Sequence, residues 1–188
     1  MSEHPKTKQD LLDGIKTATQ AALTWFDAIP TGQFFARRGE VWSASDNVDH
    51  LIRAIRPVTL ALKMPKSGLQ LVFGTSVPDV CTREGKPTSR SYDEICRTYE
   101  AAIAQGGQAS GVFLPDQKAP ADVEAQKQQL LEKLNKASQA LLAALATWDE
   151  AELDQCQLPH PLLGKLTVRE MLFFSIYHLF RHARVEGD

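Results

Sequence analysis

The sequence contains little cysteine and no apolar run long enough to cross a membrane. Its 188 residues include three cysteines, Cys81, Cys96 and Cys156, which are far apart and form no Cys-x-x-Cys pair. We therefore expect neither a disulfide framework nor a cysteine metal site, and we interpret all three as reduced thiols. The longest apolar run, residues 171–180, is ten positions long, whereas a membrane-spanning helix needs about 20.

An N-terminal targeting segment and an excess of charge of one sign are also missing. The first residues are polar, and no short apolar core follows them as it does in a secretory leader. The chain has 21 basic and 23 acidic residues, which gives a net charge of −2. We therefore expect no binding to nucleic acid, because the chain lacks the positive surplus that attracts phosphate. The short apolar run and the polar start predict a soluble cytoplasmic protein without a membrane partner.

β-branched residues are scarce relative to the residues that favour helices. The sequence has 10 Val and 7 Ile against 22 Ala and 22 Leu, a balance that nearly excludes an all-β fold. A length of 188 residues is typical of one domain, so we expect a single domain over residues 1–188.

Apolar residues repeat at intervals of three and four over several stretches, which is the spacing of one helix face. The pattern predicts four long helices and one short one, over residues 7–29, 43–62, 123–148 and 167–186 and over 91–105. Ser43 or Ser45 is expected to cap the second helix, and Pro57 predicts a kink or break near Arg56.

The connections contain the Pro and Gly residues that interrupt regular structure. Residues 64–90 and 106–120 are predicted to be irregular loops, and residues 158–164 a rigid turn. The prediction is therefore an all-α protein, an up-down four-helix bundle with a short extra helix and long irregular loops.

Five histidines are the main source of site chemistry in the sequence. His178 and His182 lie four residues apart on the last predicted helix, so both rings are on one face, as two ligands of one metal ion require. This face is apolar, where an imidazole without a partner is costly. Hydrogen bonds to neighbouring helices would satisfy the pair as well, so the spacing alone leaves a structural role and metal binding open.

A third protein ligand is typical of a catalytic metal site, which keeps one position for water or substrate. His50 on the second predicted helix is the candidate. Its ring points about 135° away from the apolar stripe of that helix, on a strip with Asn47, Ala54 and Pro57. This strip is either a small-residue wall of a cleft or a solvated face, and the periodicity does not decide between them.

Three stretches of the chain resemble the DinB/YfiT-like superfamily. They are a Trp-Ser opening followed by a histidine (residues 42–51), a His-Pro-x-x-Gly turn (160–167) and a His-x-x-x-His pair (177–182). That family is a four-helix bundle whose three histidines bind a divalent metal, with water completing the site. The resemblance implies that His50, His178 and His182 are ligands of a divalent ion such as zinc, nickel, manganese or iron.

Three further residues are expected to support the site rather than bind the ion. Proline on both sides of His160 fixes its backbone, which favours a structural turn or a role behind the ligands over direct ligation. Asn47 shares the strip of His50, and Ser175 shares the strip of the histidine pair. We expect both to have a supporting or structural role.

The resemblance implies a metal-dependent enzyme, and first of all a thiol S-transferase that joins a low-molecular-weight thiol to an electrophile. A metal-dependent hydrolase and a non-catalytic metal-binding or stress-response protein are the alternatives. Arg83, Lys86 and Arg90 are candidates for an anion-accepting mouth for a carboxylated thiol. A homodimer is compatible with exposed aromatic residues, for which the candidates are Phe34, Phe35 and Phe113.

Overall fold

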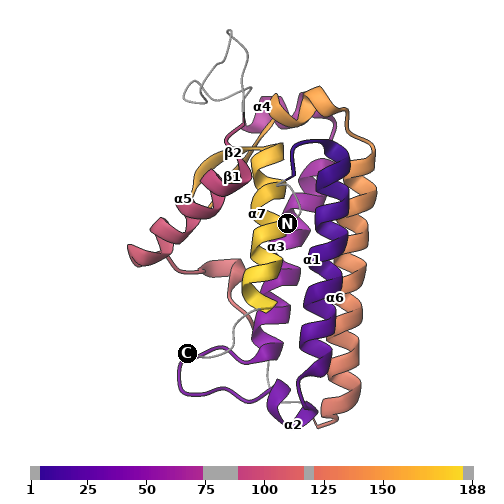
Figure 1. Cartoon of the computed structure of the whole chain (residues 1–188), viewed down its shortest axis with the longest axis vertical. Coiled ribbons are helices and arrows are strands. Elements are labelled where there is room, and N and C mark those ends of the chain that lie inside the picture. The colour runs from indigo at the N-terminus through magenta and orange to yellow at the C-terminus, as the bar shows by residue number, and fades with distance from the viewer. Residues whose placement is uncertain (1–4, 74–88, 117–120, 184–188) are drawn as a thin grey trace.

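A bundle of four long helices forms the centre of the protein. The computed structural model describes residues 5–73, 89–116 and 121–183. Within them the long helices are α1 (Lys8–Ala28), α3 (Ala44–Leu62), α6 (Val123–Ala146) and α7 (Val168–Ala183) (Figure 1). The predicted all-α bundle is confirmed. No helix in these ranges is both long and apolar enough to span a bilayer.

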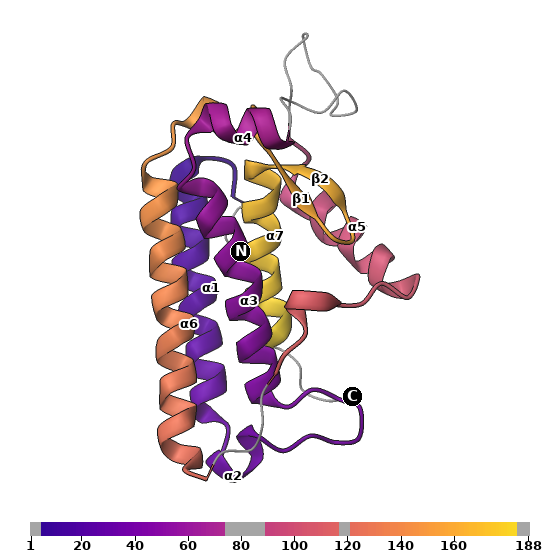
Figure 2. The ribbon, with the colours of Figure 1, turned by 180° about the vertical axis from the view of Figure 1, so that it is seen from behind.

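Shorter elements lie in the connections between the long helices. They are α2 (Thr31–Phe34), α4 (Lys66–Phe73), α5 (Tyr92–Ala104), the 3₁₀ turns η1 (Gly111–Phe113) and η2 (Glu150–Asp154), and the strands β1 (Gln157–His160) and β2 (Gly164–Thr167). The two strands form an antiparallel hairpin. Viewed from behind, α5 and the hairpin stand to the side of the bundle next to α7 (Figure 2).

Helices α3 and α6 run in the same direction, and α1 and α7 run opposite to them. Lys127 in the first turn of α6 donates hydrogen bonds to the carbonyls of Asp27 and Ile29 at the end of α1. Trp148, just after α6, donates to the carbonyl of Leu62 at the end of α3. The chain between α3 and α6 therefore has to lead from one end of the bundle back to the other.

Side-chain caps determine where several helices begin. Thr7, Ser43 and Ser91 each accept from the backbone three residues later, where an acidic side chain returns the bond, so α1, α3 and α5 start with capping boxes. Of the two serines considered for α3, Ser43 is the cap. Its carboxylate partner, Asp46, is buried and also pairs with Arg37 at 2.6 Å.

The core is built from the faces that the apolar periodicity predicts. Gly14 allows α1 to approach α7 closely, because a Cβ atom there would lie 2.8 Å from Ile176 Cδ1. The interpretation of Phe34 as an exposed residue is wrong. Phe34 lies in the short helix α2 and is fully buried in the core. The largest fully buried side chains are Trp148, Phe26, Phe34, Leu11, Ile15, Leu51, Leu69, Ile95, Leu130, Leu134, Leu141 and Leu145.

The structure differs from the sequence-based expectation at three places. Helix α3 continues through Pro57 to Leu62 without a break, because Val58 and Leu62 bury their side chains in the core beyond the proline. Helix α4 occupies the start of a predicted loop. The predicted rigid turn is the tip of the β1–β2 hairpin, where Gly164 takes up the positive φ of +71° that the turn requires.

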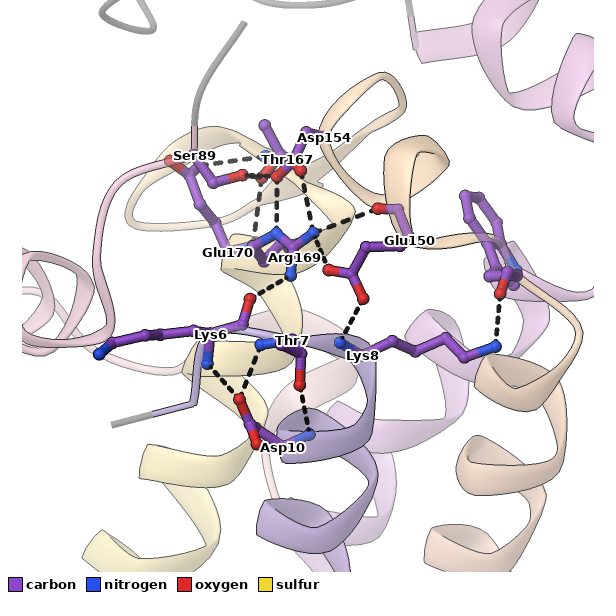
Figure 3. A network of polar contacts seen from close by, with 11 residues as sticks. Lys6, Thr7, Lys8, Asp10, Ser89, Glu150, Asp154, Thr167, Arg169 and Glu170 are labelled. Atoms are coloured by element: carbon purple, nitrogen blue, oxygen red, sulfur yellow. Dashed lines mark hydrogen bonds and ion pairs between the residues drawn. The ribbon is translucent and has the colours of Figure 1, made fainter. Parts of the chain in front are cut away.

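A polar network joins the starts of α1 and α7 to the turn that follows α6 (Figure 3). Arg169 is 8% exposed, and its guanidinium donates to Asp154 at 2.8 and 3.0 Å and to Glu150 at 2.6 Å. It also donates to the carbonyl of Lys6 at 2.8 Å. Glu150 in turn accepts from the backbone N–H of Lys8 at 2.6 Å. One side chain thus ties three segments together at this end of the bundle.

We predict that Arg169→Met lowers the free energy of unfolding by about 3 kcal/mol, since it removes the hydrogen bonds of a buried guanidinium that join Lys6, Glu150 and Asp154. Urea denaturation followed by circular dichroism measures the loss. The matched control is Lys136→Met, which removes an exposed pair with Glu132 on one helix and is expected to cost about 0.5 kcal/mol or less. Equal losses in the two variants would contradict this role of Arg169.

Candidate metal centre

Three histidines from two helices meet inside the bundle. His50 comes from α3, and His178 and His182 come from α7. One ligand nitrogen of each ring lies within 4.8 Å of the others, and the Nε2 atoms of His50 and His178 are 3.2 Å apart. Across the described ranges this is the one group of three or more His, Cys, Asp or Glu with such a geometry.

The local structure explains how distant residues reach one place. His178 and His182 are one turn apart near the end of α7, and His50 lies in the second turn of α3, which runs in the opposite direction. The strip of α3 that periodicity left undecided faces a cavity, because Ala54 and Pro57 line it together with His50. His50 and His178 are 6% and 3% exposed.

Two of the three rings are oriented by hydrogen bonds on their outer nitrogens. Nδ1 of His50 lies 2.7 Å from the carbonyl oxygen of Phe113, and Nδ1 of His182 lies 2.6 Å from Oδ1 of Asn47. Both oxygens are acceptors, since the amide nitrogen of Asn47 donates to the carbonyl of Ser43. The hydrogen of each ring is therefore on Nδ1, and Nε2 carries a lone pair that can bind a metal ion. In the absence of an ion, Nε2 of His50 accepts from Nε2 of His178 at 3.2 Å.

Burial keeps the three imidazoles neutral. Desolvation, followed by the charges of His182 and His50, holds the pKa of His178 well below its ordinary value. Desolvation lowers the pKa of His182 to about 3 and also lowers that of His50, against the effect of the Phe113 carbonyl. Metal binding needs unprotonated nitrogen, so this donor set fits a divalent ion such as zinc.

Trp42 packs against the site from the chain before α3. The ring centroid of its indole lies 5.0 Å from that of His50 and 6.3 Å from that of His182. This contact covers one side of the histidine cluster and limits the freedom of both rings. The sequence could not predict that the Phe113 carbonyl is the partner of His50. Every residue has a main-chain carbonyl, and the fold alone determines which one meets the ring.

An apolar cavity of about 90 Å³ adjoins the cluster. It is lined by parts of α3 and α7 together with α5, η1 and the β1–β2 hairpin, and it reaches His50 and His178 but not His182. Among the residues that the structure describes, no Asp, Glu, Lys or Arg lines it. The cavity thus offers a low-dielectric approach to the histidine nitrogens.

The supporting residues predicted from the sequence lie around this cavity. Asn47 contacts His182, as described above. Ser175 lines the cavity and donates its hydroxyl hydrogen to the carbonyl of Met171 at 2.8 Å. His160 also lines the cavity, and its Nδ1 accepts from the backbone N–H groups of Leu162 and Leu163. The structure therefore places His160 outside the group of three ligand nitrogens.

The predicted anion-accepting mouth is not formed by its one described residue. Arg83, Lys86 and Cys81 lie outside the described residues. The Arg90 guanidinium donates to Glu170 at 3.0 and 3.2 Å, and Glu170 is fully buried at the start of α7. Arg90 is thus engaged in the framework of the bundle.

A search of solved structures finds a protein of similar fold. The chain matches the colibactin self-resistance protein ClbS, crystallised in complex with a double-stranded DNA, with a TM-score of 0.53 and 19% identity over 95% of this chain and 92% of that one. No curated protein matches the chain significantly.

The expectation that charge excludes nucleic acid as a partner is wrong for this fold. ClbS has the same fold and is crystallised with DNA. The physical reason is that phosphate binding depends on where Lys and Arg cluster on the surface. A net charge of −2 is a sum that contains no such information.

The family assignment rests on the sequence profile of the DinB superfamily. This profile matches residues 15–185. The match includes both helices that carry the three histidines, as well as the hairpin between α6 and α7. A bundle with this histidine arrangement and a match over nearly its whole length is a member of the DinB superfamily.

Proposed function

We propose that the protein is a divalent-metal-dependent enzyme, and specifically a thiol S-transferase that joins a low-molecular-weight thiol to an electrophile. His50, His178 and His182 are its metal ligands. The observation that carries the proposal is the engagement of the Nδ1 atoms of His50 and His182 by acceptors, which leaves the Nε2 lone pairs in the cluster. A divalent ion held by neutral imidazoles promotes ionisation of a bound thiol or water near neutral pH.

The cavity beside the cluster favours an enzyme over a non-catalytic metal-binding or stress-response protein. A structural ion is enclosed by four protein ligands, whereas a catalytic ion keeps an open position. No fourth His, Cys, Asp or Glu joins the three histidines within the described ranges. The cavity leads directly to His50 and His178, so a small molecule has access to the open position.

The chemistry of the cavity wall favours a thiol over water as the nucleophile. Activation of water is usually assisted by a general base, and no carboxylate lines the described part of the cavity. A thiol has a pKa of about 8.5 and ionises far more readily than water. The apolar side chains in turn exclude water and hold the electrophile near the histidines. A metal-dependent hydrolase is the alternative for the same site.

We predict that the purified protein binds one divalent ion per chain and that His178→Ala abolishes this binding, because it removes a ligand from the centre of the cluster. Elemental analysis after dialysis against zinc measures the stoichiometry, and circular dichroism checks the fold. His160→Asn is the matched control, since it removes a histidine from the same cavity and is expected to retain the ion. Stoichiometric metal in His178→Ala would overturn the ligand assignment.

We predict that the metal-loaded protein forms thiol–electrophile conjugates faster than free metal does, and that His178→Ala reduces the rate to that of free metal. Incubation with a panel of low-molecular-weight thiols and electrophiles, followed by mass spectrometry, identifies the products. A product that gains water in place of the thiol would establish the hydrolase alternative. Absence of turnover across the panel would favour the non-catalytic metal-binding protein.

The lowered histidine pKa values also determine how the stability of the metal-free chain depends on pH. In the unfolded chain a histidine takes up a proton below pH 6.5 or so. In the folded chain the pKa is about 4 for His160 and about 3 for His182, both because of burial, so these rings stay neutral. Protons therefore bind the unfolded state preferentially, and stability falls as the pH falls from about 6.5 to 4.

We predict that the free energy of unfolding of the metal-free chain falls between pH 6 and 5 by about 1 kcal/mol for each buried neutral histidine. Urea denaturation in the presence of a chelator measures it. His178→Leu removes one such group and is expected to lower the slope by about 1 kcal/mol per pH unit. A slope that is the same in both proteins would contradict the neutral state of His178.

A further inference from the structure

His160 presents a hydrogen-bond donor that has no acceptor among the residues described by the structure. Its Nδ1 accepts from the backbone N–H groups of Leu162 and Leu163, at 3.2 and 3.1 Å. A neutral imidazole has one acceptor nitrogen and one N–H, so the hydrogen is on Nε2. Burial lowers the pKa of His160 to about 4, which keeps the ring in this neutral form.

The His160 ring is held against the cavity by aromatic neighbours. Its centroid lies 4.3 Å from that of Phe174 and 6.1 Å from that of Tyr99, and all three residues line the cavity. No hydrogen-bond acceptor for Nε2 is found in the described part of the chain, although the ring is half-buried. The N–H is therefore available to a molecule in the cavity.

Tyr99 supplies a second unused donor on the same wall. It projects from α5, is 7% exposed, and packs its ring against Phe174 and His178 with centroids 5.0 and 6.2 Å apart. Its hydroxyl makes no hydrogen bond to the residues that the structure describes. Desolvation raises its pKa, so the hydroxyl keeps its hydrogen. The fully buried side-chain polar atoms without a partner in the described ranges are Thr19 Oγ1 and Ser138 Oγ. The N–H of His160 and the hydroxyl of Tyr99 are thus both open to a ligand in the cavity that pairs with them.

We propose that His160 and Tyr99 form a donor pair that binds an uncharged acceptor oxygen, such as a carbonyl, of an apolar molecule in the cavity. The proposal rests on the proposed function in one respect, since it identifies this molecule as the electrophile. A carboxylate would also accept both bonds. The Arg181 guanidinium lies 5.9 Å over the Tyr99 ring, but it donates to the Tyr177 hydroxyl and does not line the cavity. A carboxylate would therefore enter the cavity without a cation to pair with, which is costly. The substrate class is therefore an apolar carbonyl compound.

Two probes of nearly equal shape test the donor pair. Acetophenone has a carbonyl oxygen where α-methylstyrene has a methylene group, and both are apolar and uncharged. We expect the full chain to bind acetophenone about tenfold more tightly, which corresponds to one net hydrogen bond. Ligand-detected NMR titration measures both dissociation constants, with metal-free and with zinc-loaded protein.

Two substitutions remove one donor each and are expected to reduce the preference to about twofold or less. His160→Asn places an amide oxygen where Nδ1 was, so the turn keeps its acceptor for Leu162 and Leu163 while Nε2 is lost. Tyr99→Phe removes only the hydroxyl. The matched control is Tyr177→Phe, whose hydroxyl donates to Glu100 outside the cavity, and it is expected to keep the full preference.

The proposal is overturned if neither probe shows saturable binding, if the two probes bind equally, or if the preference persists in both variants. Measurement without metal separates it from the proposed function. If the protein prefers acetophenone but binds no ion, the donor pair is supported and the metal-dependent function is contradicted. If it binds zinc but does not distinguish the probes, the metal site is supported and the donor pair is contradicted.

Discussion

The arrangement of the site depends on one constraint, which is that a buried imidazole has to find a partner for its N–H. A buried donor without an acceptor costs about 1–3 kcal/mol. His50 meets this requirement with the carbonyl of Phe113, and His182 meets it with Asn47. The first bond attaches η1 to α3, and the second joins the end of α7 to the start of α3. The histidines therefore position two segments of the chain as well as forming the candidate metal centre.

The fold separates the parts that provide stability from the parts that form the cavity. The network around Arg169 and the capping boxes hold the bundle at the ends of its helices. The cavity lies between α3 and α7 on one side and α5, η1 and the hairpin on the other. Side chains that contact a small molecule thus come from the connections as well as from the bundle.

The sequence predicted the helices well because caps and apolar periodicity are local signals. The Ser43 cap and the apolar stripe predicted α3 correctly. The break expected at Pro57 does not occur, since core packing beyond the proline outweighs one lost hydrogen bond. Lys127 interrupts the apolar pattern of α6, yet it caps the end of α1 through two carbonyls. Such a contact joins residues about one hundred positions apart and leaves no local trace.

The site could be predicted only in part for the same reason. The spacing of His178 and His182 left two interpretations open, and so did the helix strip of His50. It was the family resemblance that implied that the three histidines share one site. The contact between His50 and the Phe113 carbonyl and the tautomer of His160 both depend on backbone geometry, which cannot be predicted from residue types.

The placement of the cavity wall also has a consequence for how relatives of this chain diverge. Ile95 of α5 and Leu158 and Leu166 of the hairpin belong to the hydrophobic core. The exposed residues of α5, η1 and the hairpin lie to the side of the bundle (Figure 2), so they can be exchanged without disturbing the packing between α1 and α6. Proteins with the same helix bundle can therefore differ in the residues that line the cavity, and so in the molecules that they bind.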